Sequence, residues 1–232
     1  MPLPTLESTK YVTTIPSTGK EVEYRPFLVK EEKLLMVAQE SEDETQILNA
    51  MKDIVSACTF NKLKPDDCTL YDIEYLFLQL RIKSIGETST LSVKCGKCGK
   101  YNDVQIDLTK IKVVFPKKKI DPTIKLNDTV GVTLKPLTLK SSSKVTGTDE
   151  EIFNQAIIES IDTIFDEDNV YDINDVTEKE LIEFIDSMSH DNLEAIQEYI
   201  SSQPELKHTV KFKCKHDGYE NKLELKGIAS FF

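Results

Sequence analysis

Cysteines are the residues in this sequence whose spacing is best suited to chemistry. Cys95 and Cys98 lie three positions apart in the segment CGKCG, and Gly99 follows the second of them. Two thiolates at this spacing can occupy adjacent corners of a tetrahedron around a metal ion. The glycine lets the turn tighten so that backbone N–H groups point at sulfur. The segment is therefore typical of a zinc knuckle, although one such pair is by itself a weak signal.

A second segment near the C-terminus resembles the first. When Cys214 is aligned with Cys95, Gly218 aligns with Gly99, and both segments read as strand, knuckle and strand. Two such halves build a zinc ribbon. Here 115 residues separate Cys98 from Cys214.

The second knuckle lacks its second cysteine. Asp217 stands where the first knuckle has Cys98, and His216 directly precedes it. We therefore predict a structural zinc ion with three thiolate ligands and a fourth ligand from this pair. The predicted ligands are Cys95, Cys98, Cys214 and either His216 or Asp217. The alternative is a metal-free ribbon in which the three cysteines pack as small apolar side chains.

The sequence contains no motif of a catalytic site. HExxH, GxSxG, P-loop and GxGxxG patterns are all missing from it. Cys58 and Cys68 lie on or beside apolar helical stretches, which favours a packing role for both. The acidic segment 166–172 lacks the glycine and the final glutamate of a calcium loop, so we interpret it as a solvated loop. We therefore predict that the protein is not an enzyme.

The overall charge of the chain argues against nucleic acid and anionic membranes as partners. The 232 residues include 29 lysines and arginines and 40 aspartates and glutamates, a net charge of −11. A chain this acidic is a poor general ligand for nucleic acid or for an anionic membrane. Its apolar runs are too short to span a bilayer, and its first residues have no basic or apolar region of a signal peptide. The odd number of cysteines favours thiols or metal ligands over a disulfide framework.

The hydrophobic pattern predicts an α+β fold in a single domain, 1–232. Two helical regions flank a discontinuous, zinc-ribbon-like β unit made from residues 89–108 and 208–226, and an N-terminal β-hairpin precedes them. The predicted sub-regions are a hairpin at 11–29, helices at 30–86, β structure with the first knuckle at 89–140, a helical insert at 148–204, and the second knuckle with a C-terminal tail at 207–232.

Capping boxes that begin at Thr69, Thr148 and Thr177 mark three predicted helix starts. In the helical insert, one apolar stripe at helical spacing is formed by Phe153, Ile157, Ile161 and Ile164. The Ser/Thr-rich residues 140–147 predict a linker before this insert, and residues 166–176 predict an acidic loop within it.

Two aromatic residues, Phe231 and Phe232, end the chain. Burial of one Phe side chain contributes about 1.5–3 kcal/mol, so two exposed rings would forfeit a large gain. We predict that this tail docks on a protein partner. The alternative is that both rings close the protein's own core.

Four separate segments occur in the order of a known family. They are residues 72–87 (DIEYLFLQLRIKSIGE), residues 177–188 (TEKELIEFIDSM), the Pro-Glu-Leu at 204–206, and the terminal LKGIASFF at 225–232. Over residues 11–232 the chain resembles the T4-like bacteriophage baseplate hub and hub-assembly proteins of contractile-tailed phages. It departs from the family at Asp217, where the second knuckle usually carries cysteine.

The resemblance implies a structural or assembly role in the central hub of a phage baseplate, without catalysis. The implied partners are other hub or tail proteins, with no nucleic acid and no membrane. The resemblance is also compatible with a homo-oligomer. The implied location is the host cytoplasm during assembly, or the virion baseplate if the protein remains in the particle.

The alternative from another class is a zinc-ribbon protein that binds nucleic acid. Lys94, Lys97 and Lys100 surround the first knuckle and favour this reading. The net charge of −11 and the lack of aromatic residues interleaved on a basic strand stand against it.

Overall fold

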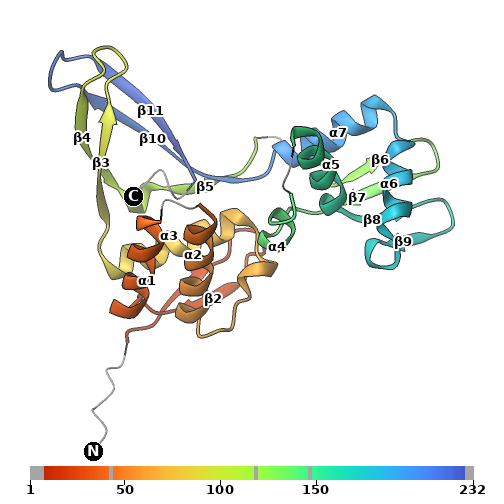
Figure 1. Ribbon diagram of the computed structural model, residues 1–232, viewed down its shortest axis with the longest axis horizontal. Coiled ribbons are helices and arrows are strands. Elements are labelled where there is room, and N and C mark those ends of the chain that lie inside the picture. Colours follow the sequence, from red (N-terminus) through yellow and green to blue (C-terminus); the bar gives the residue numbers. More distant parts are fainter. Residues whose placement is uncertain (1–7, 42–43, 118–119, 146–147, 228–232) are drawn as a thin grey trace, which may run out of the picture. The chain divides into compact units, whose positions relative to one another are not determined.

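The computed structural model describes residues 8–41, 44–117, 120–145 and 148–227, and it divides the chain into two compact units (Figure 1). Unit 1 comprises Met1–Val114 and Glu205–Phe232, and unit 2 is the intervening Phe115–Pro204. The sequence pattern predicts a single domain with a helical insert that begins at residue 148. In the structure the inserted unit begins at Phe115, because the short strands before residue 148 pack into the same core as the helices after it.

Unit 1 begins with the predicted hairpin and helices. Two short antiparallel strands form the hairpin, and Gly19, with a φ of 67°, occupies its turn. The elements in order are β1 (Tyr11–Thr14), β2 (Glu21–Tyr24), α1 (Val29–Glu40), α2 (Glu44–Cys58), the 3₁₀ turn η1 (Pro65–Asp67) and α3 (Leu70–Ser84).

Helix α3 supplies much of the core of unit 1. Thr69 and Asp72 form the predicted capping box at its start. The Oδ1 atom of Asp72 also accepts a hydrogen bond from the backbone N–H of Ser17 at 2.9 Å, which fastens the hairpin turn to this helix. The most buried apolar side chains of α3 are Ile73, Leu76, Phe77, Leu78 and Leu80.

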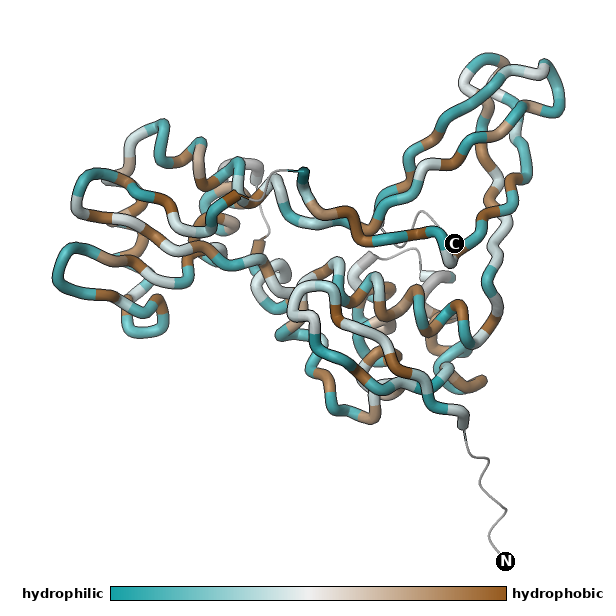
Figure 2. Tube along the Cα trace, turned by 180° about the vertical axis from the view of Figure 1, so that it is seen from behind, coloured by the Kyte–Doolittle hydropathy of each residue, from teal (hydrophilic) through white to brown (hydrophobic). Residues whose placement is uncertain are grey.

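Two longer hairpins complete unit 1 and carry the knuckles at their tips. One hairpin is a separate two-stranded sheet, and the other belongs to a three-stranded antiparallel sheet in the order β11-β10-β5. Figure 2 shows that the tips of both hairpins are largely hydrophilic. The elements are β3 (Thr88–Lys94), β4 (Tyr101–Asp107), η2 (Leu108–Lys110), β5 (Lys112–Val114), β10 (Glu205–Lys213) and β11 (Glu220–Lys226).

Unit 2 combines a four-stranded antiparallel sheet, in the order β6-β7-β8-β9, with helices. Its core contains fully buried Val132, Ile157, Ile161 and Ile196. The elements are β6 (Thr123–Lys125), β7 (Gly131–Leu134), α4 (Leu139–Ser142), α5 (Asp149–Ser160), β8 (Ile161–Phe165), β9 (Val170–Asp172), η3 (Ile173–Asp175), α6 (Glu178–Asp186) and α7 (His190–Ser201).

Three local predictions in unit 2 are wrong. The predicted helical stripe runs too far, since α5 ends at Ser160 and the next five residues form β8 between β7 and β9. The first residues of the predicted linker belong to α4, which begins at a capping box formed by Thr138 and Ser141. The predicted acidic loop contains β9 and η3. Pairing with neighbouring strands turns the end of the stripe into β8 and orders β9, while side-chain capping starts α4.

The terminal residues Phe231 and Phe232 lie outside the described residues, so the predicted docking tail stays a prediction. Among the residues that the structure does describe, no helix is both long enough and apolar enough to cross a membrane.

A buried ion pair joins the hairpin to α1. The Nη2 atom of Arg25 lies 3.0 Å from Oε1 of Glu31, and the side chains are only 11% and 6% exposed. The other carboxylate oxygen accepts a hydrogen bond from the N–H of Leu28 at 2.8 Å. Burial raises the pKa of Glu31, but Arg25 and this N–H together outweigh that effect and hold the pKa below its ordinary value.

We predict that Arg25→Ala lowers the free energy of unfolding by about 3 kcal/mol at pH 7, because it removes the buried partner of the Glu31 carboxylate and leaves only the exposed Lys30, at 3.3 Å, as a cation beside it. A carboxylate whose pKa is lowered by folding stabilises the fold above its ordinary pKa, and this contribution is lost as the pH falls. The difference between wild type and variant should therefore shrink below about pH 4, as urea unfolding at several pH values would show.

The matched control is Lys179→Ala, which removes an exposed ion pair with Glu183 on α6. It should change the free energy of unfolding by less than about 0.5 kcal/mol. Equal effects of the two substitutions would show that the Arg25 pair does not anchor the hairpin.

Candidate metal centre

The tips of the two long hairpins of unit 1 meet (Figure 1). One tip is the loop Cys95–Gly99 between β3 and β4, and the other is the loop Cys214–Gly218 between β10 and β11. Residues far apart in the sequence are in direct contact here: the backbone N–H of Gly96 donates to Oδ1 of Asn221 at 2.9 Å. The predicted pairing of the two knuckles in space is therefore present in the structure.

The two loops share one backbone conformation. In the first, the N–H of Gly99 donates to the carbonyl oxygen of Cys95 at 2.9 Å; in the second, the N–H of Gly218 donates to that of Cys214 at the same distance. The two glycines have φ angles of 69° and 71°, in the left-handed region that glycine adopts without strain. The sequence alignment of the two knuckles is thus also a structural repeat.

Four candidate ligand atoms converge between the loops. The Sγ atoms of Cys95, Cys98 and Cys214 and a carboxylate oxygen of Asp217 all lie within 4.8 Å of one another. The Cys98 and Cys214 sulfurs are 3.7 Å apart, and Oδ1 of Asp217 is 3.9 Å from the Cys95 sulfur.

His216, the other predicted fourth ligand, is not part of this group in the described residues. Its Nε2 atom lies 3.3 Å from the carbonyl oxygen of Tyr101, and its backbone N–H donates to the Cys214 sulfur at 3.4 Å. The histidine ring therefore packs against the neighbouring strand, and Asp217 is the residue that faces the thiols.

Two asparagines lock the hairpins together in a reciprocal arrangement. The Nδ2 atom of Asn102 donates to the Cys214 sulfur at 3.6 Å, while its Oδ1 accepts from the N–H of Lys215 at 2.9 Å. Asn221 does the same for the other knuckle, since its Nδ2 donates to the Cys95 sulfur at 3.5 Å and its Oδ1 accepts from Gly96. Each asparagine belongs to the hairpin opposite the cysteine that it contacts.

These two asparagines belong to the candidate site, although the sequence analysis did not single them out. The signal was present, because the alignment that equates Cys95 with Cys214 also equates Asn102 with Asn221.

The local hydrogen bonds divide the thiols by acidity. Desolvation opposes ionisation of Cys95, but the N–H groups of Cys98 and Lys97 and the Asn221 amide outweigh it and lower the pKa of this thiol to about 7. The pKa of Cys98 is raised, since desolvation and the neighbouring Cys214, Cys95 and Asp217 outweigh the N–H of Lys100 that favours the thiolate. The pKa of Asp217 is lowered, first by the N–H of Tyr219.

The two remaining cysteines are separate from this cluster. Cys58 and Cys68 are buried in unit 1, and burial raises the pKa of each thiol to about 11. Their burial agrees with the predicted packing role.

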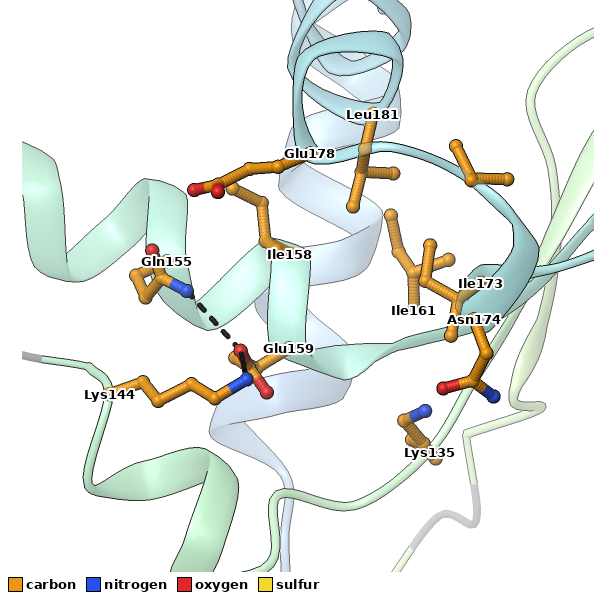
Figure 3. A pocket seen from close by; sticks show the side chains of 11 residues that line it. Lys135, Lys144, Gln155, Ile158, Glu159, Ile161, Ile173, Asn174, Glu178 and Leu181 are labelled. Atoms are coloured by element: carbon orange, nitrogen blue, oxygen red, sulfur yellow. Dashed lines mark hydrogen bonds and ion pairs between the residues drawn. The ribbon is translucent and has the colours of Figure 1, made fainter.

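A cavity of about 470 Å³ in unit 2 is a second candidate site (Figure 3). Among its lining residues, Lys144 forms an ion pair with Glu159 at 2.6 Å, and Gln155 donates to the same carboxylate. Lys135 is paired with Asp162 at 3.2 Å. Because both lysines of the cavity are already paired with carboxylates of the same unit, the cavity is a weaker candidate than the cysteine cluster.

We predict that Asn102→Ala loosens the contact between the two tips. Asn102 is only 3% exposed, and its loss removes the hydrogen bonds to Cys214 and Lys215. In chelator-treated protein, the free energy of unfolding should fall by about 1–3 kcal/mol and the cysteines of the knuckles should react faster with a thiol reagent. Asn174→Ala, at an exposed asparagine of unit 2, is the control and should change neither quantity. Unchanged thiol reactivity in Asn102→Ala would contradict the locking role.

Comparison with known proteins adds a finding about the whole chain. The family model described as T4 bacteriophage base plate protein matches residues 8–232, which include both hairpins and unit 2. Neither a curated protein nor a solved structure matches the chain. The family match confirms the resemblance seen in the four sequence segments. The chain belongs to the T4 bacteriophage base plate protein family.

Proposed function

We propose that this protein is a structural or assembly protein of the central hub of a contractile-tailed phage baseplate, and that it acts through protein contacts and not through catalysis. The family match over residues 8–232 carries the proposal. The assignment to the hub rests on the finer resemblance of residues 72–87 and 177–188. The proposed partners are other hub or tail proteins, and the proposed place of action is the baseplate.

An apolar surface on α1 supports a role in protein contacts. Val29, Met36 and Val37 are 66%, 55% and 64% exposed, although the residues of α1 that face the core, such as Ala38, are buried. We call these three residues the α1 face. A hollow of about 840 Å³ adjoins it, lined by residues that include Leu28 and Ile85, which are also exposed. Val29 itself lines this hollow, so exposed apolar side chains of α1 adjoin those of the hollow, as at a site that a protein partner covers.

The distribution of charge argues against the nucleic-acid alternative. Residues 115–204 contain eight lysines and 19 acidic residues, so unit 2 carries a net charge of −11 and the rest of the chain is neutral overall. A phosphate backbone is repelled by such a unit. A protein partner with a basic surface is attracted to it.

The test is a phage from which this gene has been removed. We expect no complete baseplates in infected cells, as seen by electron microscopy of lysates, and restoration by the wild-type gene. Normal baseplates without the gene would contradict the proposal. Mass spectrometry of purified baseplates then distinguishes a structural protein from an assembly protein, because only the structural protein remains in the particle.

The α1 face gives a sharper version of this test. Val29→Glu together with Val37→Glu should fail to restore baseplates, because two charges would have to be buried in the contact. The matched control is Val170→Glu in unit 2, at a valine that is 72% exposed and should tolerate the charge. Both variants should keep the melting temperature of the wild type. Full restoration by the double variant would show that the α1 face is not a contact surface.

A further inference from the structure

We propose that Cys95, Cys98, Cys214 and Asp217 hold one zinc ion, which clips the two hairpins of unit 1 together. The inference rests on the geometry of the hairpin tips and does not depend on the proposed place in the hub. It selects one ligand set from the two that the sequence leaves open.

The spacing of the sulfurs fits a tetrahedral zinc ion. With Zn–S bonds of about 2.3 Å, two thiolates at tetrahedral corners lie about 3.8 Å apart. The Cys98 and Cys214 sulfurs, which come from different hairpins, are 3.7 Å apart. All four candidate atoms lie within 4.8 Å of one another, so a single ion can reach each of them with small side-chain adjustments.

The aspartate replaces the missing fourth cysteine without changing the charge of the site. Asp217 occupies the position that corresponds to Cys98, and its carboxylate oxygen faces the Cys95 sulfur at 3.9 Å. A carboxylate oxygen is an accepted zinc ligand, and like a thiolate it contributes one negative charge. His216 has its ring against Tyr101, so it is excluded from the ligand set.

The surrounding hydrogen bonds are those of a preorganised thiolate site. Each of the two fully buried cysteine sulfurs accepts a backbone N–H from the residue two positions further on, at 3.4 Å in both knuckles. Each also accepts an asparagine amide from the other hairpin. Donors aimed at the ligands hold them in place and offset their negative charge, as the outer shell of a metal site does.

The ion would tie together segments that are distant along the chain. Since 115 residues separate Cys98 from Cys214, the clip constrains a long loop in the unfolded protein, and zinc binding contributes directly to folding. The same clip fixes the tips of two hairpins that share no strand pairing in the described part of the chain.

The experiment uses the full chain, purified with a reducing agent, stripped with a chelator and titrated with Co²⁺ and then Zn²⁺. We expect one cobalt ion per chain, with absorption bands of thiolate ligation and tetrahedral geometry, and displacement of the cobalt by zinc. Zinc should also raise the melting temperature. A reduced, folded protein that binds neither ion would overturn the proposal.

Four variants test the ligand set. Cys98→Ser and Asp217→Asn should weaken zinc binding at least about tenfold, a loss that even outer-shell changes cause. His216→Ala is the matched control and should bind as the wild type does. Asp217→Cys should retain binding and strengthen the thiolate-to-cobalt absorption, because it adds a fourth sulfur. A loss of binding in His216→Ala, with binding intact in Asp217→Asn, would overturn the assignment of Asp217.

Discussion

The antiparallel pairing of β5 with β10 is the contact on which the rest of unit 1 depends. Val114, the last residue before unit 2, lies opposite Glu205, the first residue after it, and Val113 lies opposite Leu206. The two ends of the insertion are therefore held side by side by main-chain hydrogen bonds. Because the entropy of closing a loop grows only with the logarithm of its length, unit 2 adds little to the cost of this pairing. Unit 1 can thus form one core from two separate stretches of chain.

The same pairing sets the position of the second knuckle. Strand β10 continues without interruption from Leu206, which is fully buried, to Lys213, and Cys214 follows directly. The register at the base of the strand therefore determines where this cysteine arrives, and the first knuckle meets it at the tips. The reciprocal contacts of Asn102 and Asn221 then fix the two loops against each other. This arrangement keeps four donor atoms together even though one of the four repeat positions carries aspartate.

The two units differ in the surfaces that they offer to partners. Unit 1 is neutral overall and exposes the apolar α1 face, whereas unit 2 carries the whole net charge of −11. Apolar surface contributes most of the free energy of a contact, while charge mainly directs the approach and rejects wrong partners. A protein of a baseplate family can use these two surfaces for different contacts.

The sequence by itself determined the elements whose signals are local. Capping boxes at Thr69, Thr148 and Thr177 begin helices as predicted, and the two alternating segments around the knuckles form hairpins, because these patterns depend on residues within one or two turns. The internal repeat also predicted which cysteines meet. Only the tertiary structure decided that Ile161–Phe165 is a strand, since its apolar spacing continues that of α5 and only the pairing with β7 and β9 distinguishes the two. Only the tertiary structure places Asp217, and not His216, within 4.8 Å of the three cysteine sulfurs, because adjacent residues of a tight turn point in different directions and the sequence does not reveal which one faces the thiols.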